Sequence, residues 1–88
     1  MRYFMHLVGE NLYLEDEEGR HLPDDAAALR EAIAALRDVT AGDVCDGYLD
    51  LTIFIAVEND AHAPLFRVDF SKAVTIFPTG NRLADMLG

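Results

Sequence analysis

A single stretch of regular alternation, YLDLTIFIAVEND, constrains the fold of this chain more than any other part of the sequence. Alternation with a period of two is typical of a β-strand, because successive side chains point to opposite faces of a sheet. One face is wholly apolar and the other is mixed, as the two sets show: Leu49, Leu51, Ile53, Ile55 and Val57 against Asp50, Thr52, Phe54, Ala56 and Glu58. The stretch therefore predicts a long strand with one fully covered face and a second face that is partly covered.

Shorter strands are predicted on either side of this one. RYFMHLV alternates near the N-terminus, and LYL follows it after a GEN turn, so the two are expected to form a hairpin. LFRVDF alternates again after the turn-forming stretch ENDAHAP. SKAVTIF is expected to continue that strand after a bulge or to form another, and NRLADMLG is expected to add a helical turn or two, with Leu83, Met86 and Leu87 on its apolar side.

The stretch HLPDDAAALREAIAALRDV predicts the main helix. Apolar positions recur at helical spacing, and polar residues lie off that stripe: the stripe comprises Leu29, Ala32, Ile33, Leu36, Val39 and Thr40. Asp24 or Asp25 is expected to cap the first turn, because a carboxylate there accepts free N–H groups and faces the positive end of the helix dipole. Gly42 is expected to end the helix. The paired aspartates therefore mark a helix start rather than a functional site.

Together these elements predict an α+β fold, with a small antiparallel sheet, the order ββαββ and one main helix packed on one face. The 88 residues are expected to form a single domain over 1–88, in which residues 78–88 are a C-terminal extension. A chain of this length buries only about 60–65% of its unfolded surface, so its own core is marginal.

The charge of the chain excludes several classes of partner. The net charge is −9, and the seven lysines and arginines are scattered singly, so direct binding to nucleic acid or to an anionic membrane is not expected. The acidic run from Glu15 through Asp16 and Glu17 to Glu18 lacks the ligand pattern of a calcium loop and is expected to be a solvated surface. With one cysteine, no apolar run long enough to span a bilayer and no signal-peptide pattern, the protein is expected to be cytoplasmic.

Residues that carry chemistry are few. The only histidine and cysteine side chains are His6, His21, His62 and Cys45, and no two of them stand at ligand spacing, so a metal site would require the fold to gather them. The chain has one serine and shows no nucleophile elbow, phosphate-binding glycine loop or Cys-x-x-Cys motif. We therefore expect no catalytic residues, no cofactor and no metal site.

Four stretches together resemble a known family. They are RYFMHL, DEEGRHLPDDAAALREAIAAL, GYLDLTIFIAVEND and PLFRVDFSKAV, which cover most of residues 2–74. The chain is similar to a family of small bacterial proteins, common in rhizobia and related alphaproteobacteria, that is classed as a domain of unknown function. Met5 stands where that family usually has phenylalanine, and Asp25 where it often has leucine. The resemblance implies a small bacterial α+β domain and no particular activity.

The second face of the sheet decides the functional expectation. One helix covers only one face, yet the apolar residues of the strands lie on both. The C-terminal segment, a second copy of the chain or another protein is expected to cover the second face, and self-association ranks first because the core is marginal. The interface candidates are Phe54, Ala56, Phe4, Tyr3 and Met86. The expected function is a non-enzymatic protein-interaction or regulatory module that acts as a homodimer. The first alternative is an acidic DNA mimic that inhibits a nucleic-acid-binding protein, and the second is a small enzyme.

Overall fold

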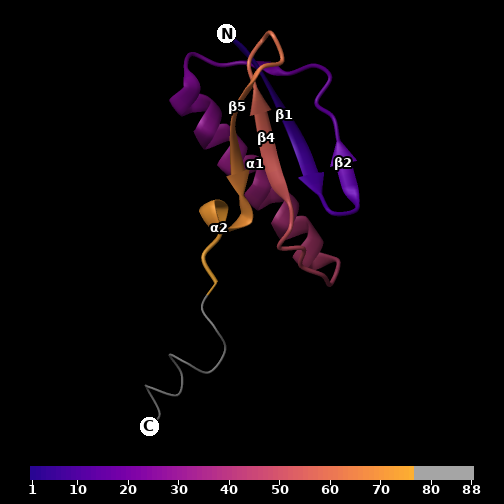
Figure 1. Ribbon diagram of the computed structural model, residues 1–88. Coiled ribbons are helices and arrows are strands. Elements are labelled where there is room, and N and C mark those ends of the chain that lie inside the picture. The colour runs from indigo at the N-terminus through magenta and orange to yellow at the C-terminus, as the bar shows by residue number, and fades with distance from the viewer. Residues whose placement is uncertain (77–88) are drawn as a thin grey trace.

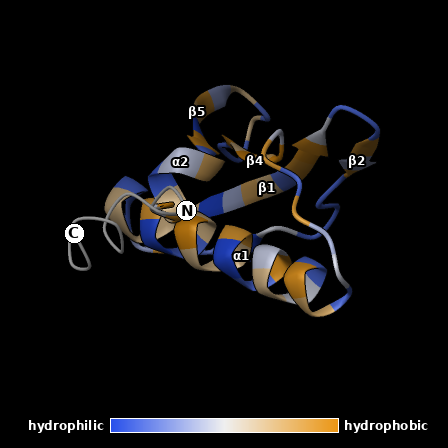
Figure 2. Cartoon of the chain, turned by 90° about the horizontal axis from the view of Figure 1, so that it is seen from below, coloured by the Kyte–Doolittle hydropathy of each residue, from blue (hydrophilic) through white to orange (hydrophobic). Residues whose placement is uncertain are grey.

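A computed structural model describes residues 1–76 of the chain. Two layers make up the fold, with the helix α1 on one side and an antiparallel sheet on the other (Figures 1 and 2). The elements in chain order are β1 (Arg2–Gly9), β2 (Leu12–Leu14), β3 (Arg20–His21), α1 (Asp25–Cys45), β4 (Phe54–Glu58), β5 (Pro64–Asp69) and α2 (Phe70–Ala73). The α+β class, the antiparallel sheet and the single main helix are confirmed. The predicted helical turn over 81–88, which includes Met86, lies outside the described residues.

The sheet has the order β2-β1-β4-β5, and the short β3 pairs with the same edge of β1 as β2 does. All pairs are antiparallel, and the central register places Leu7 opposite Ile55 and Met5 opposite Val57. β3 was not expected from the sequence, because two residues are too short to show alternation. The register brings the apolar residues of β1, β4 and β5 onto one continuous face.

That face packs against α1 and forms the core. The helix buries its small side chains Ala28 and Ala32 together with Leu36, which allows the backbone to lie close to the sheet. Leu29, Ile33 and Val39 of the predicted stripe are partly buried beside them. The other buried residues of the core come from the strands, from the residue before β4 and from α2: Tyr3, Leu7, Ile53, Ile55, Val57, Val68, Phe70 and Ala73.

The start of α1 confirms the prediction of a capped helix. Asp24 is the N-cap residue, and its Oδ1 accepts the backbone N–H of Ala27 at 2.8 Å. Asp25 begins the helix and accepts a hydrogen bond of 2.7 Å from the buried hydroxyl of Tyr3. This bond, together with burial of the ring and the nearby carboxylates, raises the pKa of Tyr3 to about 12. Both aspartates therefore have structural roles.

The predicted end of α1 was wrong. The helix continues through Gly42 to Cys45, and a Schellman motif closes it at Gly47. The N–H of Tyr48 donates to the carbonyl of Asp43, and that of Gly47 to the carbonyl of Val44, both at 3.0 Å. Gly47 has a φ of 95°, the left-handed conformation that favours glycine, whereas Gly42 remains within the helix. The sequence offers two glycines, and only backbone hydrogen bonding selects the second.

Two further predictions were wrong near the ends of strands. The long strand begins only at Phe54, because Oδ1 of Asp50 accepts both the N–H and the hydroxyl of Thr52 and holds residues 50–52 in a turn. Leu49 and Leu51 therefore lie outside the strand and are exposed. After β5 the chain forms the short helix α2 rather than more strand, and Arg37 Nε donates to the carbonyl of Ala73 at 2.7 Å.

Candidate functional site

The face of the sheet opposite α1 carries the first candidate site. The register places Phe4, His6 and Val8 on this face with Phe54 and Ala56. Tyr3, predicted as an interface candidate, instead lies on the helix side and is fully buried in the core. Alternation alone leaves open whether Tyr3, Met5 and Leu7 or Phe4, His6 and Val8 join Phe54, and the register selects the second set.

Two loops of the chain cover one end of this face, whereas the sequence analysis considered only the C-terminal segment as cover from within the chain. Phe4 is buried beneath the ring of His62, with the two ring centroids 4.3 Å apart. The loop between β2 and β3 approaches from the other side at Gly19, which has a φ of 68°. A Cβ atom at Gly19 would lie 2.7 Å from the carbonyl oxygen of Tyr3 and 3.1 Å from the ring of Phe4, so this position requires glycine.

The other end of the open face is less apolar than the sequence suggests. Phe54 is half-buried, because the guanidinium of Arg67 lies 3.9 Å from the centroid of its ring. Arg67 is held there by a 2.7 Å hydrogen bond from its Nε to Asp69. Ala56 and Val8 are also only partly exposed. A cation paired with a carboxylate therefore covers the position at which we expected an open apolar patch.

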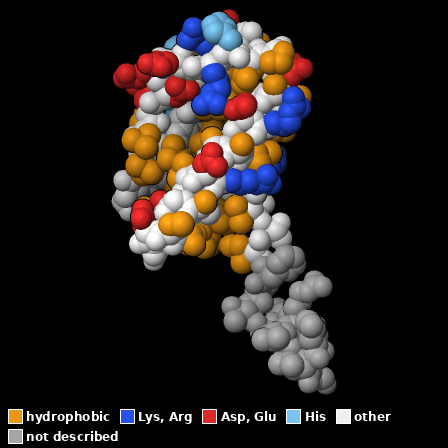
Figure 3. Space-filling model, turned by 180° about the vertical axis from the view of Figure 1, so that it is seen from behind, with side chains coloured by type: hydrophobic (Ala, Val, Ile, Leu, Met, Phe, Trp, Pro, Cys, Tyr) orange, Lys and Arg blue, Asp and Glu red, His pale blue; other side chains and the backbone are white. Residues whose placement is uncertain are grey.

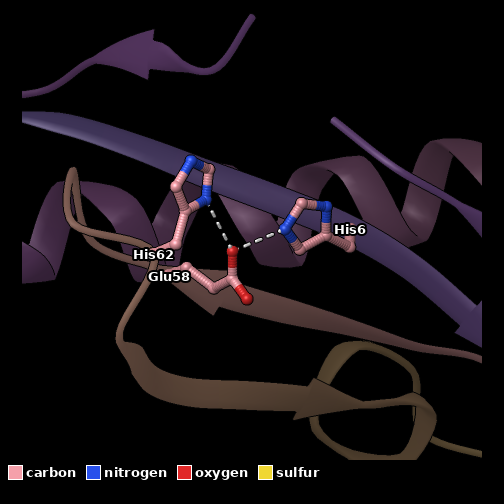
Figure 4. A group of neighbouring side chains, drawn as sticks. All are labelled: His6, Glu58 and His62. Atoms are coloured by element: carbon pink, nitrogen blue, oxygen red, sulfur yellow. Dashed lines mark hydrogen bonds and ion pairs between the residues drawn. The ribbon is translucent and has the colours of Figure 1, made fainter. Parts of the chain in front are cut away.

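At the first end, next to Phe4, lies a cluster of His6, Glu58 and His62, here called the histidine cluster (Figure 4). His6 comes from β1, Glu58 from the end of β4 and His62 from the turn before β5. Oε1 of Glu58 lies 2.8 Å from Nε2 of His6 and 3.1 Å from Nδ1 of His62. The His6 side chain is 4% exposed, whereas that of His62 is 60% exposed. The two histidines therefore share one carboxylate between a buried and a solvent-exposed position.

The tautomer of His6 follows from its second hydrogen bond. The backbone N–H of Asp16 donates to Nδ1 of His6 at 3.0 Å, so Nδ1 is an acceptor. Nε2 then carries the ring proton of the neutral imidazole and donates it to Glu58. The imidazole thus connects the acidic loop after β2 to the end of β4.

Two imidazoles and a carboxylate are also a donor set that divalent transition metals accept, and the three ligand atoms lie within 4.8 Å of one another. A metal on Nε2 of His6 would require the ring proton to move to Nδ1. In metal sites the second nitrogen of a ligating histidine normally donates to an acceptor, but here it faces the N–H of Asp16, a donor. The arrangement therefore fits a hydrogen-bonded network better than a metal centre.

The electrostatics of the histidine cluster favour an ionised carboxylate. Hydrogen bonds from His6 and then from His62 lower the pKa of Glu58, and they outweigh the opposing effect of partial burial. His62 reaches Glu58 because its backbone adopts a φ of 60°, which is uncommon for a residue with a side chain. Sequence reasoning missed Glu58, since 52 positions separate it from His6 and no local pattern links them.

The four residues of the acidic run from Glu15 to Glu18 differ in their exposure. Asp16 is partly buried, and its carboxylate accepts the backbone N–H groups of Met5 and Gly19 at 3.0 and 2.9 Å. Glu15, Glu17 and Glu18 are exposed. Asp16 thus fastens the loop to β1, and the other three make up the solvated surface that the sequence predicts.

The remaining histidine and the cysteine lie apart from the histidine cluster. His21 is in β3, where its Nε2 lies 3.0 Å from the guanidinium of Arg2. Cys45 is an exposed free thiol in the last turn of α1. The fold therefore gathers His6 and His62 and leaves His21 and Cys45 separate.

A second candidate site lies where α1 ends. The large apolar side chains of Val44, Tyr48, Leu49 and Leu51, here called the distal patch, are 55%, 58%, 48% and 56% exposed. A hollow of about 370 Å³ is lined by the first three with Gly47, and Leu51 borders a second hollow of about 460 Å³. Figure 3 shows hydrophobic side chains gathered on the helix side, toward the end where α1 finishes. The distal patch is thus a hollowed apolar surface, and two of its residues, Leu49 and Leu51, were predicted from the sequence to lie on the covered face of a strand.

The two-layer fold and its open sheet face define a small α+β domain. A model described as "Domain of unknown function (DUF6894)" matches residues 2–71. The chain belongs to this family. No curated protein and no solved structure matches the chain. In the part of the chain that the structure describes, no helix has the length and apolar character needed to cross a bilayer.

Proposed function

We propose that this protein is a non-enzymatic interaction module that binds another protein through the distal patch. The observation that carries the proposal is the exposure of four large apolar side chains that follow one another from the end of α1 to the turn before β4. A contiguous, hollowed apolar surface on a soluble domain usually marks a site of association. Tyrosine and leucine there offer a large contact area, and tyrosine is enriched at the centres of protein interfaces.

The rigidity of the segment supports this role. The Schellman motif fixes Tyr48 at the helix end, and the hydrogen bonds of Thr52 to Asp50 fix the following turn. A pre-ordered surface loses less conformational entropy on binding than a flexible one. The distal patch is therefore organised before a partner arrives.

The histidine cluster supports the non-enzymatic part of the proposal. Both ring nitrogens of His6 have partners, and Glu58 accepts from both histidines. A general base must reach a substrate proton, but the buried His6 has already used its donor and its acceptor. We assign the cluster to holding the loop after β2 and the turn after β4 against the sheet.

The other expectations about partners receive less support. Arg67 covers the ring of Phe54, so self-association through that ring stays a prediction from the sequence. A DNA mimic needs free carboxylates in rows, yet those of Asp16, Asp24 and Glu58 accept hydrogen bonds within the fold. We therefore place the binding surface at the distal patch, with a cytoplasmic location and no direct contact with nucleic acid or membrane as part of the same proposal.

Site-specific photocrosslinking in the native host tests this function. A benzophenone-bearing residue is introduced in place of Leu51 and, as a control of equal exposure, in place of Leu14 on β2, which is 57% exposed and borders neither hollow. We expect a discrete covalent adduct with a host protein from position 51 and none from position 14. Adducts of equal yield from both positions, or none from position 51, would contradict the proposal.

A further inference from the structure

The distal patch is surrounded by negative charge. Asp43 and Asp46 lie at the end of α1, and Asp50 lies in the turn that follows. The last turn of the helix carries no lysine or arginine. The C-terminal end of a helix already bears a partial negative charge, so cations are favoured there and carboxylates are not. The charges at this end of α1 are thus opposite to those that stabilise a helix.

Tyr48 responds to this negative charge, and Asp50 stays ionised within it. The carboxylate of Asp43, which accepts a hydrogen bond from the phenol, raises the pKa of Tyr48, and the charges of Asp46 and Asp50 act in the same direction. The hydroxyl and N–H of Thr52 lower the pKa of Asp50, which keeps that carboxylate ionised. The apolar side chains of the distal patch are therefore bordered by the carboxylates of Asp43, Asp46 and Asp50, here called the acidic rim.

An unfavourable arrangement that is fixed by ordered backbone is informative, because folding alone gives no reason for it. At the other end of the same helix, the charges obey the usual rule, with Asp24 as the cap and Asp25 in the first turn. A cationic group placed at the distal end would relieve the repulsion among the carboxylates and complement the helix dipole. The rim therefore indicates the charge of the missing partner.

We propose that the distal patch binds a basic amphipathic segment of another protein, in which apolar side chains fill the hollow and lysines or arginines meet Asp43, Asp46 and Asp50. This proposal rests on the function proposed above and names the chemistry of its partner. Two copies of this chain would bring two acidic rims together, and nucleic acid or an anionic lipid would add further negative charge. Charge complementarity therefore selects a basic protein segment over these occupants.

The experiment uses a fluorescent 18-residue helical peptide of leucine and lysine as the probe, with peptides in which glutamate or glutamine replaces lysine as controls. Anisotropy titrations are performed with the full chain at low and physiological salt. We expect binding of the lysine peptide only, with an affinity that falls as salt rises because the rim is exposed.

Matched variants locate the binding site. Leu51→Ser is compared with Leu14→Ser, and the pair Asp43→Asn and Asp46→Asn is compared with the pair Glu17→Gln and Glu18→Gln. We expect each distal change to weaken binding about fivefold to tenfold, as for central interface residues, and each control to change it less than twofold. Amide shifts of the wild-type protein, which require no variant, should move at residues 43–51 when the lysine peptide is added.

Several outcomes would overturn the inference. If both double variants lose affinity equally, the lysine peptide is attracted by the net charge of the whole chain rather than by a particular site. Failure of the lysine peptide to bind, or a wild-type dimer that Leu51→Ser dissociates, would exclude the basic segment as the occupant. A crosslinked partner whose contact segment lacks basic residues would refute this inference while leaving the proposed interaction function intact.

Discussion

The polar groups at the two ends of this molecule are arranged in opposite ways. At the end that holds the histidine cluster, a buried imidazole, a carboxylate and a loop amide satisfy one another. At the other end, Asp43, Asp46 and Asp50 surround exposed apolar side chains beside the negative terminus of α1. The helix α1 and the sheet extend from one end toward the other (Figure 1). The difference is what we expect if, as proposed, the first end serves stability and the second serves contact with a partner.

The largest effect that we expect comes from removing His6. His6→Ala should destabilise the fold by about 2–4 kcal/mol, because the N–H of Asp16 and the carboxylate of Glu58 would both lose a partner. His62→Ala, at an exposed position of the same cluster, should cost less than about 1 kcal/mol. Urea denaturation measures both. A His6→Ala variant as stable as the wild type would show that the network is not structural.

The helix cap gives the next effect in size. Asp24→Ala should cost about 0.5–2 kcal/mol, because the N–H of Ala27 loses its acceptor and the first turn loses a favourable charge. Asp24→Asn keeps the acceptor and serves as the control, with a smaller loss. Thermal or chemical denaturation decides between these outcomes. An equal loss in the two variants would assign the effect to charge alone.

Acidification should weaken the histidine-cluster end through Glu58. The folded pKa of Glu58 is lowered, so its contribution to stability is present above the ordinary glutamate pKa and is lost as the pH falls through the folded value. We therefore expect an acid-induced loss of stability that begins below about pH 4.5. Glu58→Gln should flatten this part of the stability profile measured in denaturant. If Glu58→Gln leaves the acid-induced loss of stability unchanged, other carboxylates cause that loss.

The smallest effect in stability provides the sharpest contrast between the two ends. Asp46→Lys should stabilise the chain by about 0.3–1 kcal/mol, because a cation replaces an anion at the negative end of α1. The same change should weaken binding of the leucine–lysine peptide. A variant that gains stability and loses affinity would separate folding from function at this end. A variant that loses both would show that Asp46 serves the fold.

Much of the fold follows from local sequence. Alternation in β1, β4 and β5 predicts strands, and the Pro-Asp-Asp step followed by an apolar stripe predicts the start and the buried side of α1. The ends of elements were predicted less well, because the stop at Gly47 and the turn at Asp50 depend on particular hydrogen bonds. Neither bond leaves a distinctive pattern among the residue types.

The candidate sites depend on contacts that local sequence does not predict. The sequence by itself determined the fold class, a helix cap at Asp24 or Asp25 and the excess of negative charge. Periodicity and capping depend on residues close together in the chain, and net charge depends on composition alone. Only the tertiary structure decided that His6 meets Glu58, that Arg67 covers Phe54 and that Leu51 is exposed. These relations join residues whose proximity depends on strand register and on where a strand begins. A single position of difference in either would turn each side chain to the other face.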